Sequence, residues 1–136
     1  MKAFDLCILA ADKPFFQGAC NSIVLPTTQG QYGILAGHRN TVAAIVPGML
    51  KYCPADGEEF IASVSEGIVK VEDGEVLVLV DTIERPEEID SNAEREQIEQ
   101  AREELLQKQS IADYHATCAR MARSIARLKT KSYKNI

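Results

Sequence analysis

The chain has 136 residues, of which 46% are hydrophobic, and its formal net charge is −5. This length suits one small domain with an appendage, and the hydrophobic fraction argues against disorder over most of the chain. The acidic balance argues against a nucleic-acid-binding protein, and no apolar run approaches the roughly 20 residues that span a bilayer.

The first 83 residues predict β-structure, beginning with the N-terminal stretch. Phe4, Leu6 and Ile8 alternate with more polar neighbours, which is typical of a half-buried strand. The acidic Asp5 and Asp12 and the short apolar core argue against a signal peptide. We therefore expect a mature first strand in a protein that begins in the cytosol.

Two Asp-Gly pairs predict β-hairpins, because a type I′ turn requires positive φ at both central residues. Asp56-Gly57 is the weaker signal, and Asp73-Gly74 is the stronger because alternating Val69 and Val71 precede it. The continuously apolar residues 76–80 follow, as expected for a central strand buried on both faces. Closely spaced short strands of this kind favour a sandwich or barrel.

Pro86 predicts the boundary between two parts of the chain. The residue before a proline avoids helical dihedral angles, so Arg85 should be extended. We place a β-domain at residues 1–85 and a helical hairpin at residues 86–136.

The hairpin is predicted from two helix starts. Ser91 and Glu94 fit a capping box that opens a helix ending near Gln107, and Ser110 opens a second helix ending near Lys131 through a weaker box. The short link between them predicts that the two helices lie antiparallel.

An apolar stripe on the second helix has the 3-4 spacing of a coiled-coil seam. Its members are Ile111, Tyr114, Cys118, Met121, Ile125 and Leu128. The first helix offers only Ile98, Ala101 and Leu105. The hairpin is therefore expected to be weakly held and able to undock. A plain stable hairpin is an equal alternative, because helix stability comes mostly from tertiary packing.

Charge is unevenly distributed between the two helices. Residues 84–109 hold nine acidic and four basic residues, whereas residues 110–136 hold one acidic and six basic residues. At 3.6 residues per turn, five basic residues share one face: Arg120, Arg123, Arg127, Lys131 and Lys134. This basic face should meet the acidic first helix or an acidic surface of another protein, and a solvated face is the alternative.

Catalytic and metal-binding motifs are missing from the sequence. It contains no nucleophile elbow, Walker loop or HExxH motif, and we expect no independent enzyme. His38 and His115 are expected to be surface or hydrogen-bonded histidines. Four irregularly spaced cysteines without a CxxC pair predict reduced thiols and no metal site: Cys7, Cys20, Cys53 and Cys118.

Three stretches occur in an order and spacing that are similar to one known family. They are the glycine-rich residues 30–38, residues 65–81 with their hairpin and valine-rich strand, and residues 84–90 before the first helix. Over nearly its whole length the chain resembles the epsilon subunit of F-type rotary ATP synthases, of the bacterial or plastid type. The resemblance implies a flattened antiparallel β-sandwich of about ten strands followed by an antiparallel two-helix hairpin.

The resemblance also implies a function. Such a subunit is noncatalytic and belongs to the central stalk, where it couples ion-driven rotation of the c ring to ATP synthesis. Its partners would be the gamma subunit, the c-subunit ring and the alpha and beta subunits, peripheral to the cytoplasmic side of the cell membrane. Its hairpin would extend along gamma, reach acidic regions of the beta subunits and restrain ATP hydrolysis, which suits a weakly held hairpin and a basic face.

Contacts carried over from the family fall on three groups of residues. The c-ring contacts would be Gly30, Gln31, Tyr32 and Gly33. The gamma contacts would be His38 and Arg39. The beta-subunit contacts would be Arg120, Arg123, Arg127, Lys131 and Lys134.

Some members of this family bind ATP in the folded hairpin through an Ile/Leu-Asp-x-x-Arg-Ala motif. Here Ala93 stands at the arginine position and Glu94 at the alanine position, so a guanidinium is missing and a carboxylate would repel phosphate. We expect weak or absent ATP binding and no cofactor. The residues that would take part are Glu84, Ile89, Asp90, Arg123 and Arg127.

Two other functions are open at this stage. A free-standing nucleotide sensor would respond to ATP titration, and an unrelated β-sandwich adaptor with a coiled-coil tail would fail to bind gamma.

Overall fold

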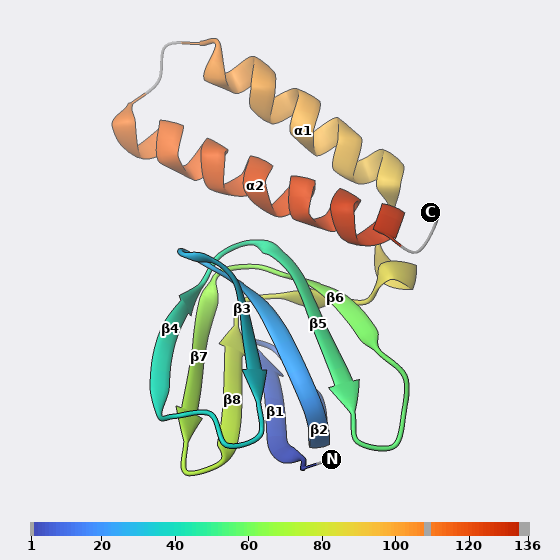
Figure 1. Cartoon of the computed structure of the whole chain (residues 1–136). Helices are drawn as coiled ribbons and strands as arrows, with labels where there is room; N and C mark the ends of the chain where they lie inside the picture. Colours follow the sequence, from blue (N-terminus) through green and yellow to red (C-terminus); the bar gives the residue numbers. More distant parts are fainter. Residues whose placement is uncertain (1, 108–109, 134–136) are drawn as a thin grey trace.

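The computed structural model describes residues 2–107 and 110–133. Within them, nine strands are followed by a short 3-10 helix and two α-helices (Figure 1). The elements are β1 Phe4–Ala10, β2 Pro14–Thr27, β3 Gly30–Leu35, β4 Thr41–Ile45, β5 Gly48–Pro54, β6 Phe60–Val64, β7 Gly67–Glu72, β8 Glu75–Val80, β9 Ile83–Glu84, η1 Pro86–Glu88, α1 Ser91–Leu105 and α2 Ile111–Tyr133. The expected sandwich followed by a helical hairpin is confirmed, with nine strands in place of about ten.

The strands form two layers that share the long strand β2. They pair in the order β1-β8-β7-β4-β2-β5-β6-β9, with β3 on β2 and a further pairing between β1 and β2. Among the strands of the described residues, every pairing is antiparallel except that of β1 with β8. This parallel pair was not predicted, because it joins strands from opposite ends of the domain and has no local sequence signature.

Burial follows the predicted alternation in β1, where Phe4, Leu6 and Ile8 are in the core. In β8, alternate valines are buried, but Leu79 is 37% exposed. The prediction that residues 76–80 are buried on both faces is therefore wrong. The reason is visible in Figure 1: the helices cover one end of the sandwich and leave the outer face of β8 open.

The two Asp-Gly pairs behave differently. Asp73 has φ 50° and Gly74 has φ 83°, so the predicted type I′ turn joins β7 to β8. Asp56-Gly57 lies in the longer connection between β5 and β6, and Gly57 does not have positive φ. The β5–β6 hairpin forms as predicted. Its predicted type I′ turn at Asp56-Gly57 is wrong, because a longer loop needs no left-handed residues.

The start of α1 corrects the predicted capping box. Asp90 is the N-cap, and its carboxylate accepts hydrogen bonds from the backbone N–H groups of Asn92 (3.0 Å) and Ala93 (3.3 Å). Ser91 is already the first helical residue, so it does not cap with Glu94. The carboxylate, one residue earlier, satisfies two free N–H groups by itself.

The other predicted boundaries lie within two residues of those observed. Arg85 is extended, with φ −75° and ψ 155°, as expected before Pro86. Ser110 accepts a hydrogen bond from the backbone N–H of Asp113 (3.1 Å) at the start of α2. The helices end at Leu105 and Tyr133.

Helix α2 lies between α1 and the sandwich, where it packs on β5 and β6. Its buried side chains are small ones: Thr117, Ser124, Ala126 and Thr130. Among the described residues of α1, only Ala101 is buried. Small residues allow packed elements to approach closely, and on α2 the buried side chains are these small ones rather than those of the apolar seam.

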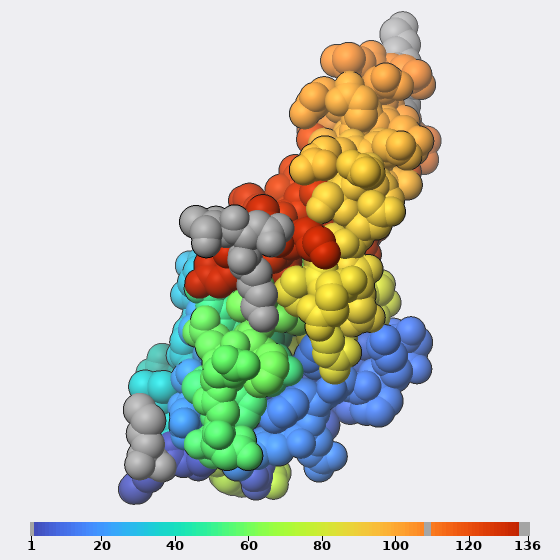
Figure 2. Space-filling model, turned by 90° about the vertical axis from the view of Figure 1, so that its right-hand side faces the viewer, coloured from blue at the N-terminus to red at the C-terminus, as the bar shows by residue number. Residues whose placement is uncertain are grey.

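The seam residues Ile111 and Tyr114 are exposed, and the other four are half-buried. Figure 2 shows why: the hairpin projects past the sandwich, so the first turns of α2 have no sheet beneath them. In the described part of the chain, neither helix has the length and hydropathy needed to cross a membrane.

All four cysteines are free. Cys20 is fully buried in the core, and this burial raises the pKa of its thiol to about 11. It therefore stays protonated and unreactive at neutral pH.

Candidate functional site

Arg127 lies where α2, α1 and the sandwich meet. Its Nε donates to Glu84 of β9 at 2.5 Å, and its Nη1 donates to Glu94 of α1 at 3.4 Å. The side chains are largely buried, with exposures of 23% for Arg127, 29% for Glu84 and 13% for Glu94. One guanidinium of α2 is thus paired with carboxylates from the sandwich and from α1.

The other described residues of the basic face are also engaged inside the molecule. Arg123 pairs with Glu66 at 3.2 Å, and Arg120 pairs with Glu104 at 2.6 Å. Lys131 donates from Nζ to the carbonyl oxygen of Pro86 at 2.9 Å. Lys134 lies outside the described residues.

In this docked arrangement the basic face meets carboxylates of the same chain. The acidic first helix supplies two of them, Glu94 and Glu104, as one alternative expected. The sandwich supplies Glu66 and Glu84, which sequence reasoning did not identify because they precede the hairpin and carry no helical periodicity. Arg127 is the least exposed of these three arginines, whereas Arg120 keeps 38% of its side chain exposed to solvent.

Residues 65–67 place Glu66 next to α2. Ser65 Oγ accepts the backbone N–H of Thr82 at 2.7 Å, which fixes the turn before β7. A Cβ added to Gly67 would lie 2.0 Å from the carbonyl oxygen of Leu79. Only glycine therefore lets β7 approach β8 at this point, with Glu66 directed toward Arg123.

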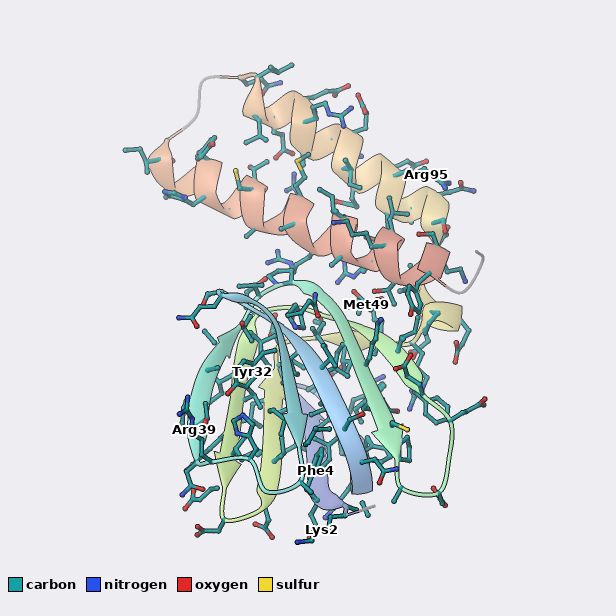
Figure 3. All side chains as sticks on the ribbon, viewed as in Figure 1. Lys2, Phe4, Tyr32, Arg39, Met49 and Arg95 are labelled. Carbon is teal, nitrogen blue, oxygen red and sulfur yellow. The ribbon has the colours of Figure 1, made fainter. Side chains whose placement is uncertain are left out.

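Tyr32, which was assigned to the c-ring contact, and His38, which was assigned to the gamma contact, are hydrogen-bonded to each other. His38 Nδ1 lies 2.8 Å from the carbonyl oxygen of Arg39, which can only accept, so Nδ1 carries the proton. Nε2 lies 2.9 Å from the Tyr32 hydroxyl and accepts its hydrogen bond in the tautomer that has the proton on Nδ1 alone. Figure 3 labels Tyr32 on β3 and Arg39 in the connection beside β4.

The other residues assigned to the c ring lie elsewhere on β3. Gly30, with φ 102°, begins the strand, and Thr27 Oγ1 donates to its carbonyl oxygen at 2.7 Å. Gly30 and Gln31 line a shallow groove with α2 residues that include Ala122. The predicted group is therefore divided between the end of the sandwich near α2 and the Tyr32–His38 pair.

An apolar patch on β4, β7 and β8 was missed by sequence reasoning. We call it the outer apolar face; it consists of Val42, Ala44, Ile68 and Leu79, which are all exposed. Ile68 pairs with both Ala44 and Leu79 across the sheet, so these three side chains are neighbours; Val42 lies two residues before Ala44 on β4, opposite Lys70. The available signal was the unbroken apolar run at residues 76–80, which was assigned wholly to the core.

Val42 is 66% exposed and Ile68 is 43% exposed. Clustered exposed side chains of this kind mark a protein contact surface more often than scattered ones do. The outer apolar face begins directly after His38 and Arg39 in the chain, since β4 starts at Thr41.

The residues named for nucleotide binding are already used by the protein itself. Ile89 is buried, Asp90 caps α1, and Arg123 and Arg127 are paired with carboxylates. Glu94 occupies the side of Arg127 that faces α1. Within residues 2–107 and 110–133, no three His, Cys, Asp or Glu side chains gather into a candidate metal site.

Comparison with known proteins identifies the family. The model of the β-sandwich domain of the ATP synthase delta/epsilon chain matches residues 3–86, which is more than half of the chain. The chain belongs to this ATP synthase delta/epsilon family. As an epsilon-type chain it is a noncatalytic subunit of an ATP synthase.

Curated relatives cover nearly the whole chain. The ATP synthase epsilon chain of Ruminiclostridium cellulolyticum is 37% identical over 94% of this chain and 95% of the relative. That of Clostridium novyi is 39% identical over 94% and 97%, and that of Chromohalobacter salexigens is 32% identical over 96% and 92%. The sequence resemblance to epsilon subunits is therefore confirmed.

Two solved structures from ATP synthases have a similar fold. A chain in the Euglena gracilis mitochondrial enzyme, solved with OSCP, F1 and the c ring, superposes with a TM-score of 0.81 at 25% identity, covering 91% of this chain and 78% of that one. A chain in the central stalk and c-ring structure of the Tetrahymena thermophila enzyme gives 0.65 at 16% identity, covering 93% and 95%, a likeness of fold alone.

Proposed function

We propose that this delta/epsilon-family chain is a central-stalk subunit that couples c-ring rotation to ATP synthesis and restrains ATP hydrolysis through its hairpin. The observation that carries the proposal is the outer apolar face, which the docked hairpin leaves open. A protein with such a face is incomplete without a partner that covers it. The complex would hold the chain at the cytoplasmic side of the cell membrane.

The gamma subunit is the proposed occupant of the outer apolar face. Burying apolar area contributes about 25 cal/mol per Å², and Val42 and Ile68 offer the side chains for it. Arg39 is exposed at the edge of this face, where it can add a polar contact to the apolar centre.

The c ring is the proposed partner of residues 30–33. Gly30, Gln31 and Gly33 are exposed, and Tyr32 is tied to His38 by a hydrogen bond. Tyr32 belongs to the proposed c-ring contact and His38 to the proposed gamma contact. The hydrogen bond between them would keep the two contact surfaces of this chain in fixed relation during rotation.

Restraint of hydrolysis is proposed to require release of the hairpin. In the docked state Arg123 and Arg127 are paired with Glu66 and Glu84. Extension of α2 would separate these pairs and offer the same guanidinium groups to acidic regions of a beta subunit. Docking and inhibition would then exclude each other.

ATP is not proposed as a strong regulatory ligand. A phosphate would have to displace Glu94 from Arg127 and approach α1 past the carboxylate of Asp90, without a guanidinium at Ala93. A thermal-shift titration should show no stabilisation at micromolar ATP. Clear stabilisation in that range would instead support the nucleotide-sensor function.

The test of the stalk assignment uses co-elution with the gamma subunit and ATP hydrolysis by the assembled soluble sector. Full-length chain is compared with a chain that ends at Ile89 and so lacks α1 and α2. We expect both forms to co-elute with gamma, since the outer apolar face is retained. Hydrolysis should be faster with the shortened chain, because the inhibitory helices are gone.

Each outcome has a separate meaning. Co-elution with unchanged hydrolysis would keep the coupling function and remove the inhibitory one. Failure of both forms to co-elute would overturn the stalk assignment and favour a β-sandwich adaptor.

A further inference from the structure

Arg127 of α2 forms ion pairs with both the sandwich, through Glu84, and α1, through Glu94. We propose that Glu84, Arg127 and Glu94 form a latch that couples docking of the hairpin onto the sandwich to closure of α1 onto α2. In this latch the Glu94 carboxylate supplies the second negative charge beside Arg127. Its consequence for inhibition rests on the proposed function, whereas the latch itself does not.

The geometry allows both pairs to form together. Glu84 accepts from Nε and Glu94 accepts from Nη1, so the two carboxylates use different nitrogen atoms of one planar guanidinium. Because the three side chains are at least 70% buried, their pairing is screened less than that of surface ions. A partly buried arginine that lost one carboxylate would carry an incompletely compensated charge.

Little apolar burial holds α1 in place, so the latch should contribute much of its attachment. Helix α1 has one buried described residue, Ala101, so apolar packing holds it only weakly. Arg120 pairs with Glu104 of α1, and Arg123 pairs with Glu66 of the sandwich. Arg127 combines both tasks, so a change on α1 should be felt at the sandwich interface.

Glu94 is therefore a positioning residue that acts through Arg127. Its carboxylate accepts from Nη1 of Arg127 and so helps to hold the guanidinium against Glu84. In this arrangement the chain itself supplies both negative charges beside Arg127.

The test is amide hydrogen exchange of the full-length chain, with peptides from α1, α2 and the β1–β2 core followed separately. The variants are Glu94→Gln and Glu84→Gln, which keep shape and remove charge. Their controls are Glu96→Gln on α1 and Glu87→Gln in η1, both exposed. We expect each latch variant to raise exchange in both helices by about tenfold, because an undocked hairpin with little apolar packing frays.

The pattern of exchange decides the outcome. Unchanged core protection in β1 and β2 shows that the sandwich is folded, and the controls should match wild type. If Glu94→Gln loosened α1 alone and left α2 protected, docking and closure would be independent and the latch would be disproved. The same conclusion follows if Glu94→Gln matched Glu96→Gln.

Repeating the exchange measurement with ATP tests whether the carboxylate of Glu94 keeps phosphate away from Arg127. Millimolar ATP should leave the exchange of α2 in the wild-type chain unchanged. Several-fold protection by ATP would show that Arg127 is available to phosphate and would overturn this part of the proposal.

The assembled enzyme separates the latch from the inhibitory function. Faster hairpin exchange together with slower ATP hydrolysis in Glu94→Gln would support both the latch and the inhibitory function of the released hairpin. Faster exchange without any change in hydrolysis would keep the latch and count against inhibition by the released hairpin.

Discussion

At the scale of single residues, the sandwich depends on a few positions where only one side chain is possible. Gly67 is the clearest, because a Cβ there would come within 2.0 Å of a backbone oxygen of β8. The same segment carries Glu66, which pairs with Arg123 of α2. A close backbone approach in the core thus sets the position of a charge that meets the hairpin.

Gly67→Ala should destabilise the chain by about 2–3 kcal/mol, because β7 and β8 must move apart to accept the methyl group. Urea unfolding followed by circular dichroism measures the change. The control is Gly33→Ala, where a Cβ meets nothing within 4 Å and φ is not positive. A loss in Gly67→Ala no larger than in this control would show that the strands separate easily.

At the scale of elements, the start of α1 decides how the hairpin is built. Asp90 satisfies two backbone N–H groups, and the helix that follows has little apolar burial of its own. Its first turns also carry Glu94, the latch residue. Fraying at this end would therefore weaken the Arg127 pair as well as the helix.

Asp90→Ala should cost about 1 kcal/mol and raise amide exchange in the first turn of α1, since the N-cap acceptor is lost. Asp90→Asn is the matched control, because asparagine caps as well as aspartate. Ser91→Ala should have almost no effect on the same amides. A larger effect from Ser91 than from Asp90 would restore the capping box that the sequence suggested.

At the scale of the whole molecule, the hairpin and the proposed gamma surface lie on different sides of the sandwich. The helices cover one end of it, and the outer apolar face stays open on β4, β7 and β8 (Figure 1). Release of the hairpin would therefore not require release from gamma. This separation is what a subunit that stays bound while its hairpin moves would need.

Ile68→Asp should weaken co-elution with gamma by about 30-fold or more, as expected when a charge is placed in the centre of an apolar contact. Stability should change by less than about 1 kcal/mol, because Ile68 is already partly exposed. Leu106→Asp makes the same kind of change at an exposed position of the hairpin and should leave co-elution intact. Equal loss in both variants would indicate a general effect on association rather than a specific surface.

Local patterns in the sequence were enough to determine several features. The alternation in β1, the type I′ turn at Asp73-Gly74 and the extended Arg85 were predicted because each depends on a few neighbouring residues. The order of three motifs also pointed to the family. Helical periodicity likewise identified a basic face on α2.

Only the tertiary structure decided what those features contact. Pairing of β1 with β8, exposure of Leu79 and the docking of Arg127 onto Glu84 and Glu94 all join parts of the chain that are distant in sequence. Periodicity shows that residues share a face but not which element covers it. Burial and ion pairing are properties of the space around a side chain, and that space is filled by the rest of the fold.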